Sequence, residues 1–173
     1  MILVIHAHPY PSRSRACRTL VESIRNVAAL EVRSLYELYP DFDIDIDAEQ
    51  AALARAALVV WLHPLYWYTV PGLMKHWLDQ VLVGGWAHGP GGEALKGKDC
   101  LWVTTTGGDE QAYSPQGRHG HRFADFTPVM EQTARYCGMN WLPPFVVNGA
   151  HVVSQAALLE AGDRLRWLLE RRG

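Results

Sequence analysis

Three consecutive aromatic residues, Tyr66, Trp67 and Tyr68, lie between an apolar run and a helical pattern. Their rings could hold a flat conjugated molecule by stacking and edge contacts. An arbitrary aromatic triplet is more often part of a core or an interface, so that alternative stays open. Which of the two applies depends on where the neighbouring elements place the triplet.

A second group of reactive residues occupies positions 104–121, beginning with the sequence TTTGG. Glycine after a strand lets backbone amides approach a ligand closely, although Gly-Gly is also an ordinary turn. Tyr113 and His119 stand further along the same loop. A tyrosine hydroxyl and an imidazole can together stabilise charge that develops on a ring oxygen, and histidine can donate a proton near neutral pH. Each can also be an ordinary polar surface residue.

The segment HPYPSRSRAC at positions 8–17 could bind a phosphate group. Ser12 and Ser14 supply hydroxyl groups, and the start of the following helix supplies free backbone N–H groups at residues 14–17. Arg13 and Arg15 add positive charge. The alternative is that a serine merely caps the helix. Cys17 stands at the same helix start, where a thiol can become acidic, but we expect a small packing residue there.

Spacing argues against several other kinds of site. No HExxH motif occurs among the histidines, including His6 and His8, and we expect no metal site. The glycine-rich segment 84–97 lacks the Gly-Lys-Ser/Thr ending of a P-loop, and DFDIDID at 41–47 lacks the glycine and terminal glutamate of an EF-hand. No Gly-x-Ser-x-Gly motif indicates a hydrolase, and the three cysteines form no CxxC pair.

Composition is that of one ordinary globular domain, residues 1–173. Hydrophobic residues make up 49% of the chain and charged residues 20%, and the formal net charge of -2 provides no basic surface for nucleic acid. No apolar run approaches the ~18 residues of a membrane span, and the start MILVIHAHPY looks like a strand rather than a signal peptide. We therefore expect a cytoplasmic protein.

Short β-rich runs alternate with helical patterns along the chain. The predicted strands span residues 2–5, 32–35, 57–62, 99–105 and 141–147, and the predicted helices span about 14–27, 48–55, 71–83, 125–137 and 158–169. The polar loop at 106–121 is long for a compact domain, which usually indicates function. This alternation predicts an α/β three-layer sandwich with a five-stranded parallel sheet in the flavodoxin-like order 2-1-3-4-5.

The three candidate segments follow strands that this order makes neighbours. Residues 8–17 follow the first strand, residues 65–70 the third, and residues 106–121 the fourth. Ligands of open α/β sheets bind outside the carboxyl ends of the strands, at the point where the strand order reverses. We therefore expect one shared site at this edge of the sheet.

Several stretches together resemble the flavodoxin-fold NAD(P)H:quinone oxidoreductases, the diaphorase-like enzymes. The loop TTGGDEQAYSPQGRHG resembles the corresponding diaphorase loop, and the whole chain is still more similar to the bacterial ancillary flavoproteins of glutathione-gated potassium-efflux systems. The resembling stretches are ILVIHAHPYP, RSLYELYPDFDIDI, WLHPLYWYTVPGLMKHWLD, GWAHGPGG, TTGG and YCGMNWLPPF. They cover most of residues 1–145, and their combination is specific although each alone is weak.

The resemblance implies a tightly bound flavin, a homodimer, and two-electron transfer from NADH or NADPH through the flavin to a quinone. The diaphorases hold the adenine of FAD with a C-terminal extension beyond the end of this sequence, so FMN is the expected flavin. Tyr113 and His119 would stabilise charge on the reduced flavin, and Trp86 and His88 would form a lid over the partner subunit's site. The residues expected to bind the flavin are His8, Ser14, Arg15, Ala16, Cys17, Leu65, Tyr66, Trp67, Tyr68, Thr105, Thr106, Gly107 and Gly108.

Two departures from the resemblance leave alternatives. Cys17 stands where the family usually has asparagine, which removes a side-chain contact near the phosphate. The loop with Tyr113 and His119 is closer to the diaphorases than to the potassium-efflux relatives. One alternative is a regulatory subunit that docks peripherally on the cytoplasmic domain of a potassium-efflux antiporter. A one-electron carrier like flavodoxin ranks last, because such carriers tend to be strongly acidic and this chain is nearly neutral.

Overall fold

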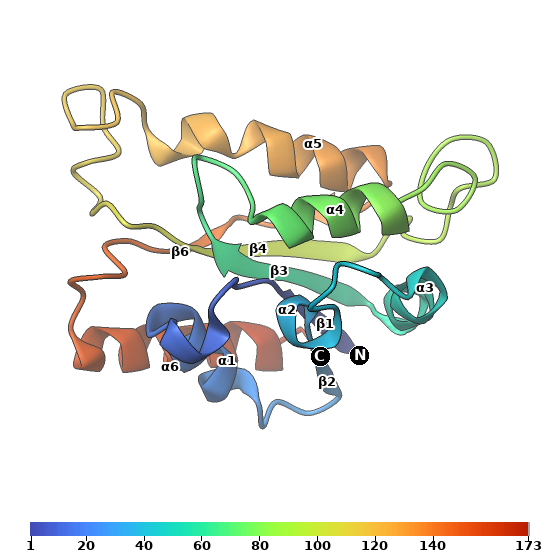
Figure 1. Cartoon of the computed structure of the whole chain (residues 1–173), viewed down its shortest axis with the longest axis horizontal. Helices are drawn as coiled ribbons and strands as arrows, with labels where there is room; N and C mark the ends of the chain where they lie inside the picture. Colours follow the sequence, from blue (N-terminus) through green and yellow to red (C-terminus); the bar gives the residue numbers. More distant parts are fainter. Residues whose placement is uncertain (173) are drawn as a thin grey trace.

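The computed structural model describes residues 1–172, in which a parallel sheet lies between two layers of helices (Figure 1). The strands are β1 (Ile2–His6), β2 (Leu30–Ser34), β3 (Leu58–Pro64), β4 (Asp99–Thr105), β5 (Asn140–Trp141) and β6 (Phe145–Val147). The helices are η1 (Pro11–Arg13), α1 (Ala16–Ile24), α2 (Leu35–Leu38), α3 (Ile46–Arg55), α4 (Gly72–Val81), η2 (Phe123–Phe126), α5 (Pro128–Tyr136) and α6 (Gln155–Glu170). Within these residues, no helix is both long and apolar enough to cross a membrane.

The sheet confirms the predicted order, β2-β1-β3-β4-β5, with every pair parallel. The predicted single strand at 141–147 is wrong, because it is split into β5 and β6, which both pair with β4. Pro143 and Pro144 lie between the two pieces. Proline has no N–H group to donate to a sheet, so two consecutive prolines interrupt the pairing.

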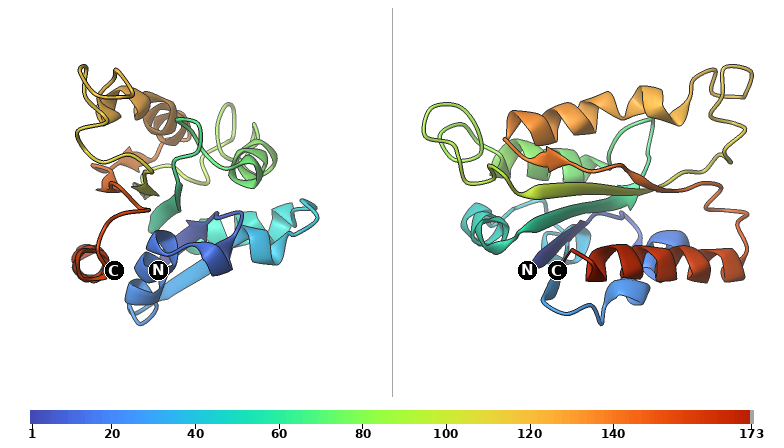
Figure 2. Two further views of the ribbon diagram at one scale, coloured as in Figure 1. Left: turned by 60° about the vertical axis from the view of Figure 1, so that its left-hand side comes forward. Right: turned by 180° about the vertical axis from the view of Figure 1, so that it is seen from behind.

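Helices cover both faces of the sheet. One core contains residues of α1 and α6, and the other contains residues of α2, α3, α4 and α5 (Figure 2). The side chains of Trp61, Trp77 and Trp102 are fully buried in the second core. Much of the tryptophan in this sequence therefore serves packing rather than a ligand site.

Only part of the helical stripe over residues 125–137 is buried. The spacing predicts one face at positions 126, 129, 130, 133 and 136 or 137, yet the side chains of Val129 and Tyr136 are 66% and 62% exposed. Met130 and Cys137 are buried as the spacing predicts, and Ala134 is buried with them. The exposed pair leaves an apolar surface on α5 beside α4.

Glu49 of α3 is fully buried and joins four segments of the chain. Its carboxylate accepts hydrogen bonds from the Arg33 guanidinium at 2.6 Å, the Tyr39 hydroxyl at 2.6 Å and the Trp77 indole N–H at 2.9 Å. Burial and the neighbouring carboxylate raise the pKa of Tyr39 to about 12, so the hydroxyl stays protonated and able to donate. A buried carboxylate with all of these partners has a structural role, because losing one would leave an uncompensated charge.

Two buried histidines lie at the carboxyl ends of their strands. The His63 Nδ1–H donates to the carbonyl of Pro64 at 2.9 Å, and its Nε2 accepts from the Trp102 indole at 2.8 Å. His6 is hydrogen-bonded through Nδ1 to the Ser34 hydroxyl at 2.9 Å. Burial lowers the pKa of each imidazole to about 4, so both are neutral at physiological pH.

Candidate functional site

Two adjoining pockets lie where β1, β3, β4 and β6 end. The α1 pocket, of about 440 Å³, lies between the start of α1 and the loop after β4. The Tyr68 pocket, of about 350 Å³, is lined by the aromatic segment after β3 and by the long loop after β4. Leu65, Gly107 and His151 line both pockets, so the two form one elongated cleft. Each volume is within the ~300–1,000 Å³ of small-molecule sites.

The N-terminus of α1 opens into the α1 pocket. Ser14 is buried there, and no side chain within residues 1–172 caps the helix. By contrast, Asp45 caps α3 and Ser154 caps α6. The simple capping role considered for Ser12 and Ser14 is therefore wrong, and the N–H groups of the first turn are left for a ligand.

Arg13 and Arg15 have different surroundings. The Arg15 guanidinium donates to the carbonyl oxygens of Ala150 and Val153, at 3.3 and 2.5 Å. Arg15 thus ties the start of α1 to the segment after β6. Arg13 is exposed at the pocket rim, with its guanidinium 5.9 Å from the Tyr10 ring centre. Arg13 is the more available of the two cations for an anionic ligand.

Cys17 and His8, which are predicted to lie near the phosphate group, have neutral side chains. Cys17 is buried, with its Sγ 3.5 Å from the Thr105 Oγ1, and burial raises its thiol pKa. An acidic, reactive thiol is therefore excluded at this helix start. His8 accepts the backbone N–H of Tyr10 at Nδ1, at 3.0 Å, and burial lowers its pKa.

The aromatic triplet forms a tight turn rather than part of the core. Tyr66 and Thr69 exchange two backbone hydrogen bonds, at 3.1 and 3.0 Å. The φ values of Trp67 and Tyr68 are +48° and +64°, the left-handed pair of a type I′ turn, which normally requires Asn or Gly. Such backbone costs about 1–3 kcal/mol per residue and is typical of ligand-binding segments. The Trp67 side chain is 91% exposed, so packing within this chain does not account for it.

Tyr113 and His119 meet each other and Tyr68 in the Tyr68 pocket. The Tyr113 and His119 rings stack with their centres 4.3 Å apart, and the Tyr68 hydroxyl lies 3.2 Å from His119 Nδ1. His119 Nε2 is buried and has no hydrogen-bond partner in the described part of the chain. Burial raises the pKa of Tyr113, so its hydroxyl remains a donor at neutral pH. The two residues proposed for catalysis thus form one stacked unit.

Gly108 permits this arrangement by lacking a side chain. A Cβ at Gly108 would lie 2.8 Å from His119 Nε2 and 3.0 Å from the Cβ of Ala112. Thr106 is buried, with its hydroxyl 2.7 Å from the Gly108 carbonyl and 2.9 Å from Asn148 Oδ1. Thr106 therefore shapes the glycine loop through its side chain.

The segment after β6 is a part of the cleft that the sequence analysis missed. Ala150 lines the α1 pocket, and His151 lines both pockets. Asn148 and Gly149 directly follow the last strand, which is the same carboxyl-end position as the other three loops. Applying the carboxyl-end rule to the fifth predicted strand would have identified this segment.

Trp86 and His88 lie at the opposite end of the sheet from the cleft of the same chain. Their loop precedes β4, whereas the loop of Tyr113 and His119 follows it, and the two loops project at opposite ends in Figures 1 and 2. Trp86 packs against the core, and the His88 ring centre lies 4.8 Å from that of Tyr136. In one chain they are therefore remote from Tyr113 and His119.

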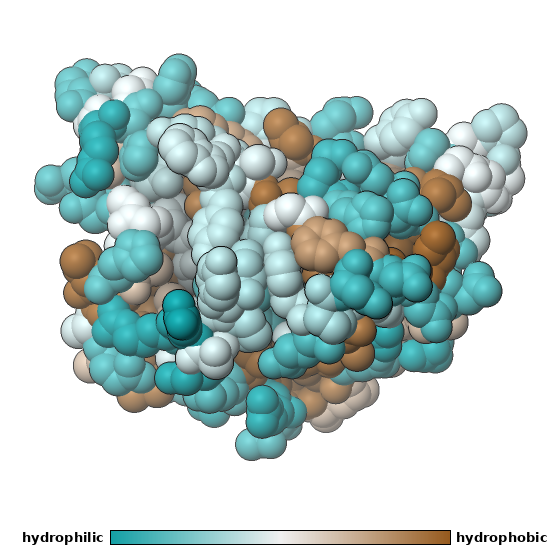
Figure 3. All heavy atoms as spheres, in the orientation of Figure 1, coloured by the Kyte–Doolittle hydropathy of each residue, from teal (hydrophilic) through white to brown (hydrophobic). Residues whose placement is uncertain are grey.

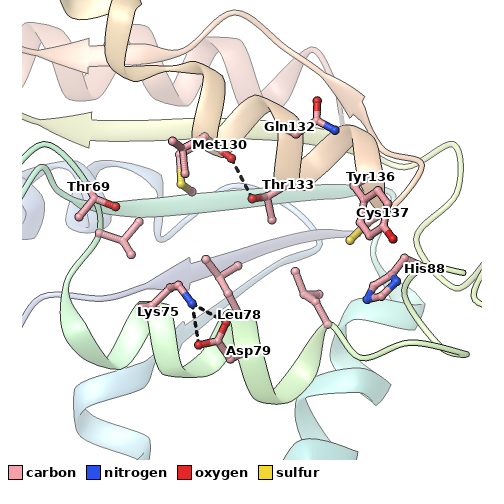
Figure 4. A pocket seen from close by; sticks show the side chains of 13 residues that line it. Thr69, Lys75, Leu78, Asp79, His88, Met130, Gln132, Thr133, Tyr136 and Cys137 are labelled. Atoms are coloured by element: carbon pink, nitrogen blue, oxygen red, sulfur yellow. Dashed lines mark hydrogen bonds and ion pairs between the residues drawn. The ribbon is translucent and has the colours of Figure 1, made fainter.

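An apolar groove of about 460 Å³ separates α4 from α5 (Figure 4). It extends from Thr69, in the aromatic turn, to His88 at the other end of the molecule. Lys75 and Asp79 form an ion pair on the α4 side. In the space-filling view, hydrophobic atoms reach the surface among hydrophilic ones in the region of these two helices (Figure 3). This α4–α5 groove therefore begins at the aromatic turn, whose Trp67 and Tyr68 line the Tyr68 pocket.

Relatives of this chain match nearly its whole length. A model of the family described as flavodoxin-like fold matches residues 1–168. The glutathione-regulated potassium-efflux system ancillary protein KefF of Citrobacter koseri is 49% identical over 158 residues, which cover 91% of this chain and 89% of that protein.

Solved structures share the fold closely. General stress protein 14 of Treponema denticola, in complex with FMN, is 32% identical, with a TM-score of 0.92 and 99% of each chain covered. A thermophilic tryptophan halogenase from Streptomycin violaceusniger is 33% identical, with a TM-score of 0.91 and 95% of each chain covered. An NADPH-quinone reductase from P. pentosaceus is 25% identical, with a TM-score of 0.88, covering 97% of this chain and 96% of its own.

Proposed function

Since this chain belongs to the flavodoxin-like fold family, we propose that it is an FMN-dependent NAD(P)H:quinone oxidoreductase. The observation that carries this proposal is the single elongated cleft formed by the α1 pocket and the Tyr68 pocket. One end suits an anion and the other a flat aromatic ring, which together match the shape and charge of a flavin mononucleotide. Similar structures support it, because one contains FMN and another is named an NADPH-quinone reductase.

The residues of the cleft fit this cofactor. The open N-terminus of α1 can receive the phosphate group. A Cβ built at Gly107 would meet only the His151 ring, at 3.6 Å, so the backbone there is open to close approach by a ligand. The Nε2 atom of His119 is buried and has no hydrogen-bond partner among residues 1–172. A polar atom of the flavin ring would supply one.

Bound FMN would supply the two-electron chemistry, and the residues of this chain would bind and orient the reactants. The aromatic turn would hold the flavin ring through its backbone and through ring packing. Tyr113 and His119 would donate hydrogen bonds to charge that develops on the reduced ring, with His119 oriented by the Tyr68 hydroxyl. NAD(P)H and the quinone would occupy the same place beside the ring in turn.

Purified protein is expected to carry, or to take up, one FMN with the visible absorption of an oxidised flavin. Adding NADPH or NADH without oxygen should bleach that absorption, and adding a quinone should restore it. An absorption spectrum before and after each addition provides the measurement. A protein that remains colourless after incubation with FMN contradicts the proposal.

We also propose that the protein is a homodimer with the α4–α5 groove in its interface. A two-fold interface uses the same surface on both subunits in opposite directions. The groove has the cleft at one end and the Trp86 and His88 loop at the other. An antiparallel pairing across it would therefore bring the lid residues of one subunit towards the cleft of its partner. The exposed side chains of Val129 and Tyr136 would be covered in such a dimer.

Val129→Glu is expected to convert the dimer to monomers, because it places a charge in the apolar groove. The monomer should turn over more slowly than the dimer, because each cleft would lose the partner's lid. The monomer should still bind FMN. Sedimentation measures the assembly, and Leu159→Glu, at an exposed position on α6, is the matched control. A wild-type monomer, or a Val129→Glu dimer as stable as the control, would exclude this interface.

A second candidate is regulation of a potassium-efflux antiporter, which the 49% identity to KefF favours. In this role the protein would be cytoplasmic and would bind the antiporter at the inner face of the membrane, with its reductase activity secondary. Unchanged potassium efflux in a strain that lacks this protein would exclude the role. That experiment leaves the reductase proposal untouched.

A further inference from the structure

We infer that His151 is a further flavin-contacting residue and that it raises the reduction potential of the cofactor. This inference rests on the proposed function. His151 follows β6 and lines the α1 pocket and the Tyr68 pocket together. Leu65 and Gly107 also line both pockets, and among these three residues His151 alone carries a polar side chain.

The backbone around His151 is held in place from two directions. The N–H of Gly149 donates to the Gly108 carbonyl at 2.8 Å, and the N–H of Ala150 donates to the Thr106 carbonyl at 2.8 Å. From the opposite side, the Arg15 guanidinium donates to the Ala150 carbonyl at 3.3 Å. The loop after β4 and the residue that precedes α1 therefore fix the position of the residue that follows. Arg15 is a positioning residue for His151 in this arrangement.

The His151 ring lies beside the backbone of Gly107, where the two pockets join. A Cβ built on Gly107 would be 3.6 Å from both Cδ2 and Nε2 of the imidazole. A ligand that occupies both pockets must cross this junction. In FMN the atoms between the phosphate and the ring are the ribityl chain, and the ring edge beside its attachment carries N1 and the C2 carbonyl. His151 would therefore lie near the ribityl attachment, within reach of that edge.

Hydrogen bonds and charge near N1 alter the electronic properties of a flavin. The two-electron-reduced ring carries its negative charge at this edge, whereas the oxidised ring is neutral. An imidazole N–H directed there favours the reduced form more than the oxidised form. Tyr113 and His119 line only the Tyr68 pocket of the two, so His151 acts on the ring from a separate position.

The test is the reduction potential of bound FMN, with dissociation constants for the oxidised and reduced cofactor. His151→Phe should weaken binding of reduced FMN about tenfold more than binding of oxidised FMN, which lowers the two-electron potential by about 30 mV. His151→Gln, which keeps a donor, should recover most of the loss. His76→Phe, at a half-buried position on α4 that lines neither pocket, is the control.

Each result separates this inference from the proposed function. A wild-type protein that binds no FMN overturns both. A wild-type protein that binds FMN and is reduced by NADPH, with His151→Phe and His76→Phe at the same potential, overturns the role of His151 alone. Equal potentials for the Phe and Gln variants would also overturn it, because the donor would then have no effect.

Discussion

His119→Gln is expected to slow quinone reduction by about 10²–10⁴-fold while the protein keeps its FMN. The imidazole stacks on Tyr113 at 4.3 Å and is oriented by the Tyr68 hydroxyl at 3.2 Å. Glutamine can donate a hydrogen bond, but it cannot exchange a proton near neutral pH. The loss should therefore appear in turnover rather than in cofactor binding, and stopped-flow reoxidation by a quinone measures it.

Tyr113→Phe tests the second member of the stacked unit. The effects of substituting two residues that act together are not additive. The variant with both His119→Gln and Tyr113→Phe should therefore be little slower than the slower single variant. His121→Gln is the matched control, since His121 is an exposed histidine two residues along the same loop. If His119→Gln reacts as fast as this control, His119 is not catalytic. If the variant loses its flavin, the role of His119 is structural.

Acidification from pH 7 to pH 4 should destabilise the fold by several kcal/mol. Burial lowers the pKa of His6 and of His63 from 6.5 to about 4. Between these values the unfolded chain binds a proton at each histidine and the folded chain does not. The contribution of each histidine to the free energy of unfolding is therefore complete above pH 6.5. It is lost as the pH falls towards 4, by about 1.4 kcal/mol per pH unit for each histidine.

Urea unfolding at pH 7, 6 and 5 measures this loss, in a range where most carboxylates are still ionised. His63→Gln should halve the dependence of the unfolding free energy on pH, to about half of the wild-type slope, because one of the two buried imidazoles is then absent. The slope is informative even if this variant is less stable at pH 7. An unfolding free energy that is equal at pH 7 and pH 5 would contradict the assignment of both histidines as neutral in the folded state.

Much of the fold follows from local patterns in the sequence. β4 has its predicted bounds of 99–105, because an apolar run is followed there by a glycine turn. The strand order and the shared edge of three loops follow from the alternation of strands and helices. Pro143 and Pro144 themselves indicate the break, because proline cannot donate to a sheet, although the apolar residues on both sides favour a single strand.

Other features depend on contacts between distant segments. Val129 and Tyr136 have the spacing of core residues, and their exposure depends on how α5 lies against α4. The carboxyl-end rule places the segment of His151 at the cleft, but the position of His151 between the two pockets depends on hydrogen bonds to the loop after β4. The turn at Trp67 and Tyr68 contradicts local preference, because these residues rarely adopt positive φ. Local conflict of this kind is expected at functional sites.

The two prolines that divide the last strand also affect how the molecule behaves in a crowded solution. A long, flat strand at the edge of a sheet is a template on which a second chain can add a strand and begin to aggregate. Here that edge consists of β5, with two residues, and β6, with three. Pro143 and Pro144 add no N–H donors between them. This edge is thereby a poor starting point for cross-chain β-sheet growth.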